Sequence, residues 1–140
     1  MAFVNLDSSA FIAEGELLDA LRGQAVPVDC ASTRVLFKQG DEAIGLFILH
    51  SGAVKMTIDG PDGEQVVSTA VGAGSLLGLP GLVGNAAYSM SAKAEAGAVV
   101  TFVNREEFSK LMLTQPPLGM MILRVLAAEV RTARMAIAKG

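Results

Sequence analysis

Between Val26 and Val103, apolar and polar residues alternate in short runs separated by glycines. In the segment 54–59 every second residue is apolar, beginning with Val54, and the residues between are polar. This is the period of a β-strand with one buried face. The run Leu46–Leu49 is continuously apolar, which predicts a short strand covered on both faces.

Turn signals lie between these runs. Residues 59–63 read Asp-Gly-Pro-Asp-Gly and predict a hairpin, and Ser51-Gly52 predicts another turn. Further strand-like runs span residues 66–71 and 99–103. Many short strands at this spacing predict a mainly β fold with flanking helices: a double-stranded β-helix, or jelly-roll-like β-roll, over residues 26–103.

Helical spacing precedes the β region. Residues 8–22 carry apolar side chains near a period of 3.6, which predicts a short N-terminal helix. Ser8 or Ser9 is the expected N-cap and Gly23 the expected stop, while Gly15 weakens the interior of the pattern.

Two helices are expected over residues 104–138. Asn104 and Glu107 have the spacing of a capping box and predict the start of the first helix. Pro116 ends it, and Pro117 suits the first position of the next. That last helix, from about Leu118 to Ala138, is the longest element predicted.

The last helix has more apolar surface than one face needs. One stripe has the 3-4-3-4 spacing of a two-stranded coiled coil; it comprises Leu123, Leu126, Val130, Ala133 and Ile137. A second stripe comprises Met121, Ile122 and Val125. A homodimer through this helix would cover both stripes. The alternative is a helix buried within its own domain.

Composition narrows the function classes. The 140 residues have a net charge of −3 and suit one domain, residues 1–140, without a basic stripe for nucleic acid. One cysteine, Cys30, and one histidine, His50, exclude sites that need several thiolates or imidazoles, so we expect no metal, no cofactor and no enzyme. No signal peptide or membrane-spanning run is apparent, which favours the cytoplasm.

An ordered set of motifs resembles a known family. Residues 35–41, 45–49 and 51–55 resemble the opening of the β-roll in cyclic nucleotide-binding domains, and Asp62-Gly63-Glu64 and the segment 104–108 follow in order. The pattern is most similar to the sensor half of Crp/Fnr-type transcription regulators. The resemblance implies a dimer through the long helix, and DNA binding only if a helix-turn-helix domain exists outside this chain.

The resemblance also places a ligand pocket. The family binds a cyclic phosphate with a short helical turn, a glutamate and an arginine; here Leu79 and Tyr88 stand at the glutamate and arginine positions. Tyr88 either donates a hydrogen bond to a ligand or fills the vacated volume. The candidate ligand-binding residues are Gly78, Leu79, Pro80, Tyr88, Ser89, Ser91 and Arg134.

The expected function is therefore that of an effector-sensing regulatory domain. Loss of two charge-assisted contacts costs roughly 3–6 kcal/mol, about a hundred- to ten-thousand-fold in affinity, so tight binding of cyclic AMP is not expected. The expected effector is a small molecule, either a cyclic nucleotide or another compound. The alternative is a ligand-free module for dimerisation or protein interaction, whose pocket is filled by its own side chains.

Overall fold

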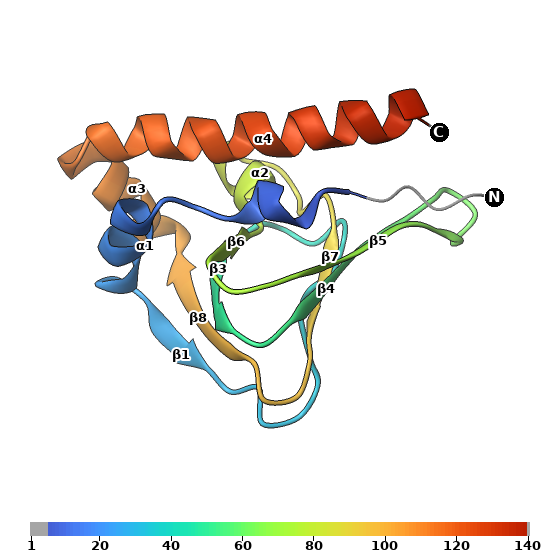
Figure 1. Ribbon diagram of the computed structural model, residues 1–140. Coiled ribbons are helices and arrows are strands. Elements are labelled where there is room, and N and C mark those ends of the chain that lie inside the picture. Colours follow the sequence, from blue (N-terminus) through green and yellow to red (C-terminus); the bar gives the residue numbers. More distant parts are fainter. Residues whose placement is uncertain (1–5, 140) are drawn as a thin grey trace.

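Two antiparallel four-stranded sheets form the β-roll (Figure 1). The computed structural model describes the backbone of residues 6–139 and the side chains of residues 6–132. One sheet has the order β1-β8-β3-β6 and is built from β1 (Val26–Val28), β8 (Val99–Asn104), β3 (Gly45–Ser51) and β6 (Ser75–Leu77). The other has the order β2-β7-β4-β5 and is built from β2 (Arg34–Phe37), β7 (Ser91–Ala94), β4 (Val54–Asp59) and β5 (Gln65–Val71). The predicted mainly β, jelly-roll-like fold is confirmed.

One apolar core lies between the two sheets. Phe47 and Leu49 enter it from β3, Met56 from β4 and Ala92 from β7. Four residues of 54–59 follow the predicted alternation, because Val54 and Met56 are buried while Lys55 and Asp59 are exposed. The predicted hairpin joins β4 to β5, and its turn includes Gly63 at φ 83°.

A second apolar core lies on the other face of the β1-β8-β3-β6 sheet, under the helices. Leu46 and Ile48 of β3 face this core, which explains why the whole run 46–49 is buried. The helices that cover it are α1 (Gly15–Arg22), α3 (Arg105–Thr114) and α4 (Pro117–Lys139). In Figure 1, α4 runs across one end of the roll above the short helix α2 (Leu79–Val83).

The prediction of a single N-terminal helix over residues 8–22 is wrong. The chain instead forms a 3-10 helix, η1 (Ser8–Phe11), and then α1. Between them Ile12 forms a β-bridge with Ser75, and the amide of Ala13 donates to the Gly74 carbonyl at 3.0 Å. The N-cap is Asp7, whose carboxylate accepts from the Ser9 amide at 3.0 Å.

The C-terminal helices begin where the sequence predicts. The Asn104 side chain accepts a hydrogen bond from the Glu107 amide at 2.8 Å, and α4 starts at Pro117. Within the described residues, no helix is both long and apolar enough to cross a lipid bilayer.

Candidate functional site

Helix α2 is packed tightly against the segment that follows it. Gly78 precedes the helix at φ 91°, and a Cβ on this residue would lie 2.7 Å from Cε1 of Tyr88. A Cβ on Gly81 would lie 2.6 Å from the carbonyl oxygen of Ala87. Both positions therefore need glycine, and their small size closes α2 onto residues 87–88.

Tyr88 is a core residue with its hydroxyl already engaged. Its side chain is 3% exposed, and its hydroxyl donates to the Gly45 carbonyl at 2.7 Å. The ring stacks on Phe37, with centroids 4.0 Å apart and an interplanar angle of 20°. Burial raises the pKa of the phenol, which keeps it protonated as a donor. Of the two interpretations left open by the sequence, this geometry favours a residue that fills volume.

A small cavity of about 10 Å³ lies inside the roll, where α2 and α4 meet it. A volume of about 10–15 Å³ holds a single water molecule. Its lining includes Gly78, Pro80 and Ser89, three of the predicted ligand-binding residues, and Glu129 of α4. The pocket is thus almost filled by the protein's own side chains.

Glu129 places a buried carboxyl group at this cavity. Its Oε2 atom is buried and has no hydrogen-bond partner among the described residues. Burial raises the pKa of Glu129 to about 8, because the ionised form loses its hydration. Glu129 is not among the ligand-binding residues predicted from the sequence. Glu129 lies four residues after Val125, on the same helix stripe as Ile122 and Val125. This spacing is the sequence signal that could have identified it.

The remaining predicted ligand residues do not converge on one place. Leu79 is fully buried in the helical core, away from the cavity. Ser89 lines the small cavity, whereas Ser91 lines a groove on the outer surface of the β2-β7-β4-β5 sheet. The two serines are separated because β7 begins only at Ser91, whereas residues 89–90 form a bend. The Arg134 side chain lies outside the described residues.

Arg105 holds the loop after α2. Its guanidinium donates to Oδ1 of Asn85 at 2.7 Å and to the carbonyl of Ala43. Asn85 itself adopts a left-handed conformation, with φ 52°. The predicted ligand residues did not include Arg105, which lies just after the capping residue of α3. It positions residues 84–88 rather than facing the cavity, because it does not belong to the cavity's lining.

The family profile described as "Cyclic nucleotide-binding domain" matches residues 27–115, which is more than half of the sequence. This chain belongs to the cyclic nucleotide-binding domain family.

Similarity to a curated regulator agrees with this membership. A "CRP-like cAMP-activated global transcriptional regulator" of Mycobacterium tuberculosis is 26% identical over 118 residues, which cover 84% of this chain and 53% of the relative. The chain therefore spans about half the length of the curated relatives it matches. The expected resemblance to the sensor half of Crp/Fnr-type regulators is confirmed.

Solved structures show the same fold. The Thermus thermophilus catabolite activator protein superposes with a TM-score of 0.78 at 22% identity, over 89% of this chain and 59% of that one. The N-terminal domain of a transcriptional regulator from Streptomyces coelicolor A3(2) gives 0.64 at 23% identity, over 88% and 85% of the two chains.

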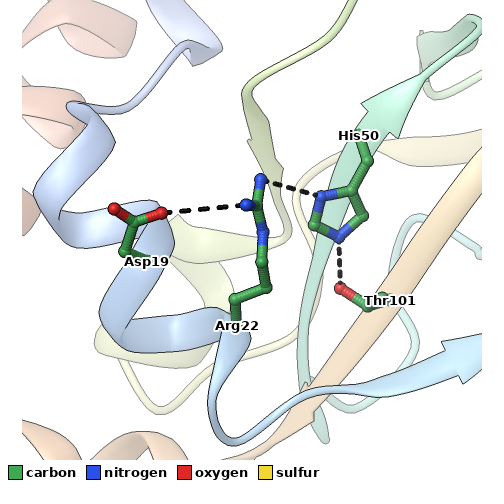
Figure 2. Close-up of polar contacts among 4 residues, drawn as sticks. All are labelled: Asp19, Arg22, His50 and Thr101. Carbon is green, nitrogen blue, oxygen red and sulfur yellow. Dashed lines mark hydrogen bonds and ion pairs between the residues drawn. The ribbon is translucent and has the colours of Figure 1, made fainter.

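His50 of this cyclic nucleotide-binding domain has a structural role (Figure 2). Its Nδ1 accepts from Arg22 at 3.4 Å, and Nε2 donates to the Thr101 hydroxyl at 2.8 Å. Arg22 also lies 3.7 Å from Asp19. Burial, and then the Arg22 charge, lower the pKa of His50. The neutral ring therefore links α1 to β3 and β8. Among the residues whose side chains the structure describes, no cluster of three or more potential ligands for a metal ion is present.

The long helix of the domain has one covered stripe and one open stripe. Ile122 and Val125 are buried against the roll, whereas Leu123 is 56% and Val130 is 52% exposed. Leu126 is half-buried between them. An apolar groove of about 490 Å³ between α3 and α4 continues the open stripe past Leu123. Of the predicted seam, Ala133 and Ile137 lie outside the residues whose side chains are described.

Proposed function

We propose that this chain is the effector-sensing domain of a Crp/Fnr-like regulator, and that its effector is a small molecule without a phosphate group. The observation that carries the proposal is the content of the pocket. Leu79 and Tyr88 stand where the family has its glutamate and arginine, and a buried carboxyl group, Glu129, faces the cavity. A buried phosphate needs a cationic partner, and no Lys, Arg or His among the described residues lines this cavity. Glu129, whose raised pKa keeps it mostly neutral at pH 7, supplies no positive charge, and its ionised form would repel the anion.

The same chemistry favours a ligand with a hydrogen-bond donor or a positive charge. Such a group would supply the partner that Oε2 of Glu129 lacks among the described residues. An unsatisfied buried acceptor costs about 1–3 kcal/mol, so a donor on the ligand gains that energy when it binds. Because the cavity has room for about one water molecule, binding of a larger ligand requires α4 or the loop after α2 to move, and the ligand favours the more open packing.

A thermal-shift panel of matched pairs tests this function. Each nucleoside is compared with its cyclic monophosphate, and each small amine with the corresponding carboxylate. A ligand that binds only the folded state raises the melting temperature. We expect stabilisation only by nucleosides or amines, and loss of the amine effect in Glu129→Gln. Saturable binding of cyclic AMP in calorimetry would overturn the proposed ligand class.

A second candidate function is a ligand-free dimerisation module, and the small volume of the cavity favours it. A cavity of about 10 Å³ leaves no room for an effector without rearrangement. The two functions differ in the panel: the module shows no shift with any compound, while its dimerisation is unchanged.

Dimerisation through α4 is common to both functions. The open stripe of Leu123 and Val130, with the adjoining groove, is an apolar surface that a second copy of the helix would cover. We expect Leu123→Glu to reduce the solution mass from two subunits to one. Val26→Glu is the matched control, since Val26 is 57% exposed but lies on β1, at the other side of the roll (Figure 1). A wild-type mass of one subunit would contradict the dimer.

A further inference from the structure

A groove with three lysines lies on the outer face of the β2-β7-β4-β5 sheet. Its volume is about 690 Å³, which is within the range of roughly 300–1,000 Å³ typical of small-molecule sites. Lys38, Lys55 and Lys93 line it. These are three of the five lysines in a chain whose net charge is −3, so the cations are concentrated here against the overall charge.

The strand register brings two of the lysines face to face. Lys55 of β4 is the direct partner of Lys93 of β7, and two residues along β4 Thr57 is the partner of Ser91. Directly opposite residues of antiparallel strands have Cβ atoms about 4.5–5.5 Å apart, and like charges at such positions are destabilising. The groove therefore has a pair of ammonium groups beside a pair of hydroxyls. Repulsion between the two ammonium groups lowers the stability of the fold unless an anion neutralises them.

Two common structural roles of surface lysines, protection of a sheet edge and ion pairing, do not account for these lysines. Lysine often protects the exposed edge of a sheet, but β4 and β7 are the two central strands of this one. The ion pairs found among the described residues involve Arg22, Lys110 and Arg124, and none of the three groove lysines. The lining includes one carboxylate residue, Asp59.

The end of the groove is held in place by hydrogen bonds. Gln39 accepts from the Asp59 amide at 2.8 Å and donates to the Asp59 carbonyl at 3.2 Å, which ties β2 to the end of β4. The amide of Gln39 donates to the Ser91 hydroxyl oxygen at 2.9 Å. The concave shape is thus held by hydrogen bonds of the chain itself, which reduces the ordering cost of binding.

We propose that this groove binds a small polyanion of the pyrophosphate class, with Lys55 and Lys93 as its principal contacts and Lys38 at the rim. A ligand with two adjacent phosphate groups neutralises neighbouring ammonium groups at once and accepts hydrogen bonds from the Thr57 and Ser91 hydroxyls. The site is separate from the cavity inside the roll, because Lys55 and Thr57 point outward where Met56 points inward.

Calorimetric titration with inorganic pyrophosphate tests the site. We expect one ion bound per chain, and affinity about tenfold weaker in Lys55→Gln and in Lys93→Gln. Lys110→Gln is the matched control, because Lys110 is an exposed lysine on α3, outside the groove. A second arm uses adenosine diphosphate: tighter binding than pyrophosphate identifies a nucleotide as the source of the anion, and equal binding identifies the diphosphate group alone.

Two results would overturn the proposal. One is the absence of saturable heat with both ligands up to ~5 mM, the weak end of specific affinity. The other is an equal loss of binding in Lys110→Gln, which would indicate a general effect of charge. Melting temperatures of the variants separate loss of the site from loss of the fold. The outcome does not depend on an effector inside the roll, since the substituted residues do not line that cavity.

Discussion

The two faces of the β2-β7-β4-β5 sheet have opposite character. On the inner face, Met56 and Ala92 are buried in the core, and Met56 lines a cavity of about 10 Å³ that has the carboxyl group of Glu129 at its wall. On the outer face of the same strands, Lys55 and Lys93 line a groove of about 690 Å³. The groups that suit an anion are thus outside the roll, and the group that disfavours one is inside.

The alternation of side chains along a strand produces this difference. Because successive residues point to opposite faces, one pair of strands supplies both surfaces, and each can change without moving the other. The β1-β8-β3-β6 sheet has no such freedom, since Phe47 and Leu49 enter one core while Leu46 and Ile48 enter the second. The β2-β7-β4-β5 sheet is therefore the one that can acquire a second binding surface.

The largest expected effect comes from Tyr88→Ala, which opens the inner face. Removing a buried aromatic ring typically costs about 3–5 kcal/mol, through lost burial and a residual cavity. Here the stacking on Phe37 and the hydrogen bond to Gly45 are lost as well. Urea denaturation should show a loss of this size, while pyrophosphate binding on the outer face should not change.

Tyr88→Phe isolates the hydroxyl in the same assay. The ring remains, and only the bond to the Gly45 carbonyl is lost, which costs about 1 kcal/mol. If Tyr88→Phe were as damaging as Tyr88→Ala, the packing argument would fail and the hydroxyl would be the main contribution of this residue.

Glu129→Gln tests the inner carboxyl group through pH. The pKa of Glu129 is raised from 4.5 to about 8, so between these values the folded chain keeps a proton that the unfolded chain has lost. The stability of the wild type should then fall as the pH rises from about 4.5 to about 8. Glutamine does not ionise, so the variant should gain, relative to the wild type, on the order of 3 kcal/mol at neutral pH and nothing near pH 4.

Melting temperatures across this pH range give the measurement, with Glu64→Gln on the exposed β4–β5 hairpin as the control. The control should follow the wild-type curve. Parallel curves for Glu129→Gln and the wild type would mean that the carboxyl group is hydrated, so a donor on the ligand would gain nothing from it and the proposed preference for donors would lose its basis.

Much of the fold was predictable because local signals agree with it. The alternation in 54–59, the Asn104 cap and Pro117 each specify an element through their near neighbours, and the structure has all three. The prediction of one N-terminal helix was wrong because the break in that helix depends on a distant turn. The carbonyl of Gly74, about sixty residues away, accepts a hydrogen bond from the amide of Ala13.

The candidate site was less predictable, since it depends on rotations and registers that local patterns do not fix. Glu129 is buried because of the stripe of α4 that faces the roll. Ser89 and Ser91 line different cavities because the chain bends before β7. The lysine pair also arises from register: Lys55 and Lys93 are 38 positions apart in sequence and become neighbours only through β4–β7 pairing.

The smallest expected effect concerns that lysine pair. Lys55→Gln removes one of two opposed like charges and should raise the stability by roughly 0.2–1 kcal/mol at low salt. The gain should vanish at about 1 M salt, where the Debye length is about 3 Å. Urea denaturation at both salt concentrations provides the measurement, and Lys110→Gln should show no gain, because Lys110 lies 3.9 Å from Glu107 rather than opposite a lysine.

The double variant with Lys93→Gln decides whether the gain comes from the pair. Repulsion between two charges is relieved once either charge is removed, so the double variant should be about as stable as each single variant rather than twice as improved. Added pyrophosphate should reverse the order, since the wild type alone keeps both ammonium groups and is stabilised by the bound ion. If the single gains add, the two lysines act independently, and the outer face loses the feature that distinguishes it from an ordinary solvated sheet.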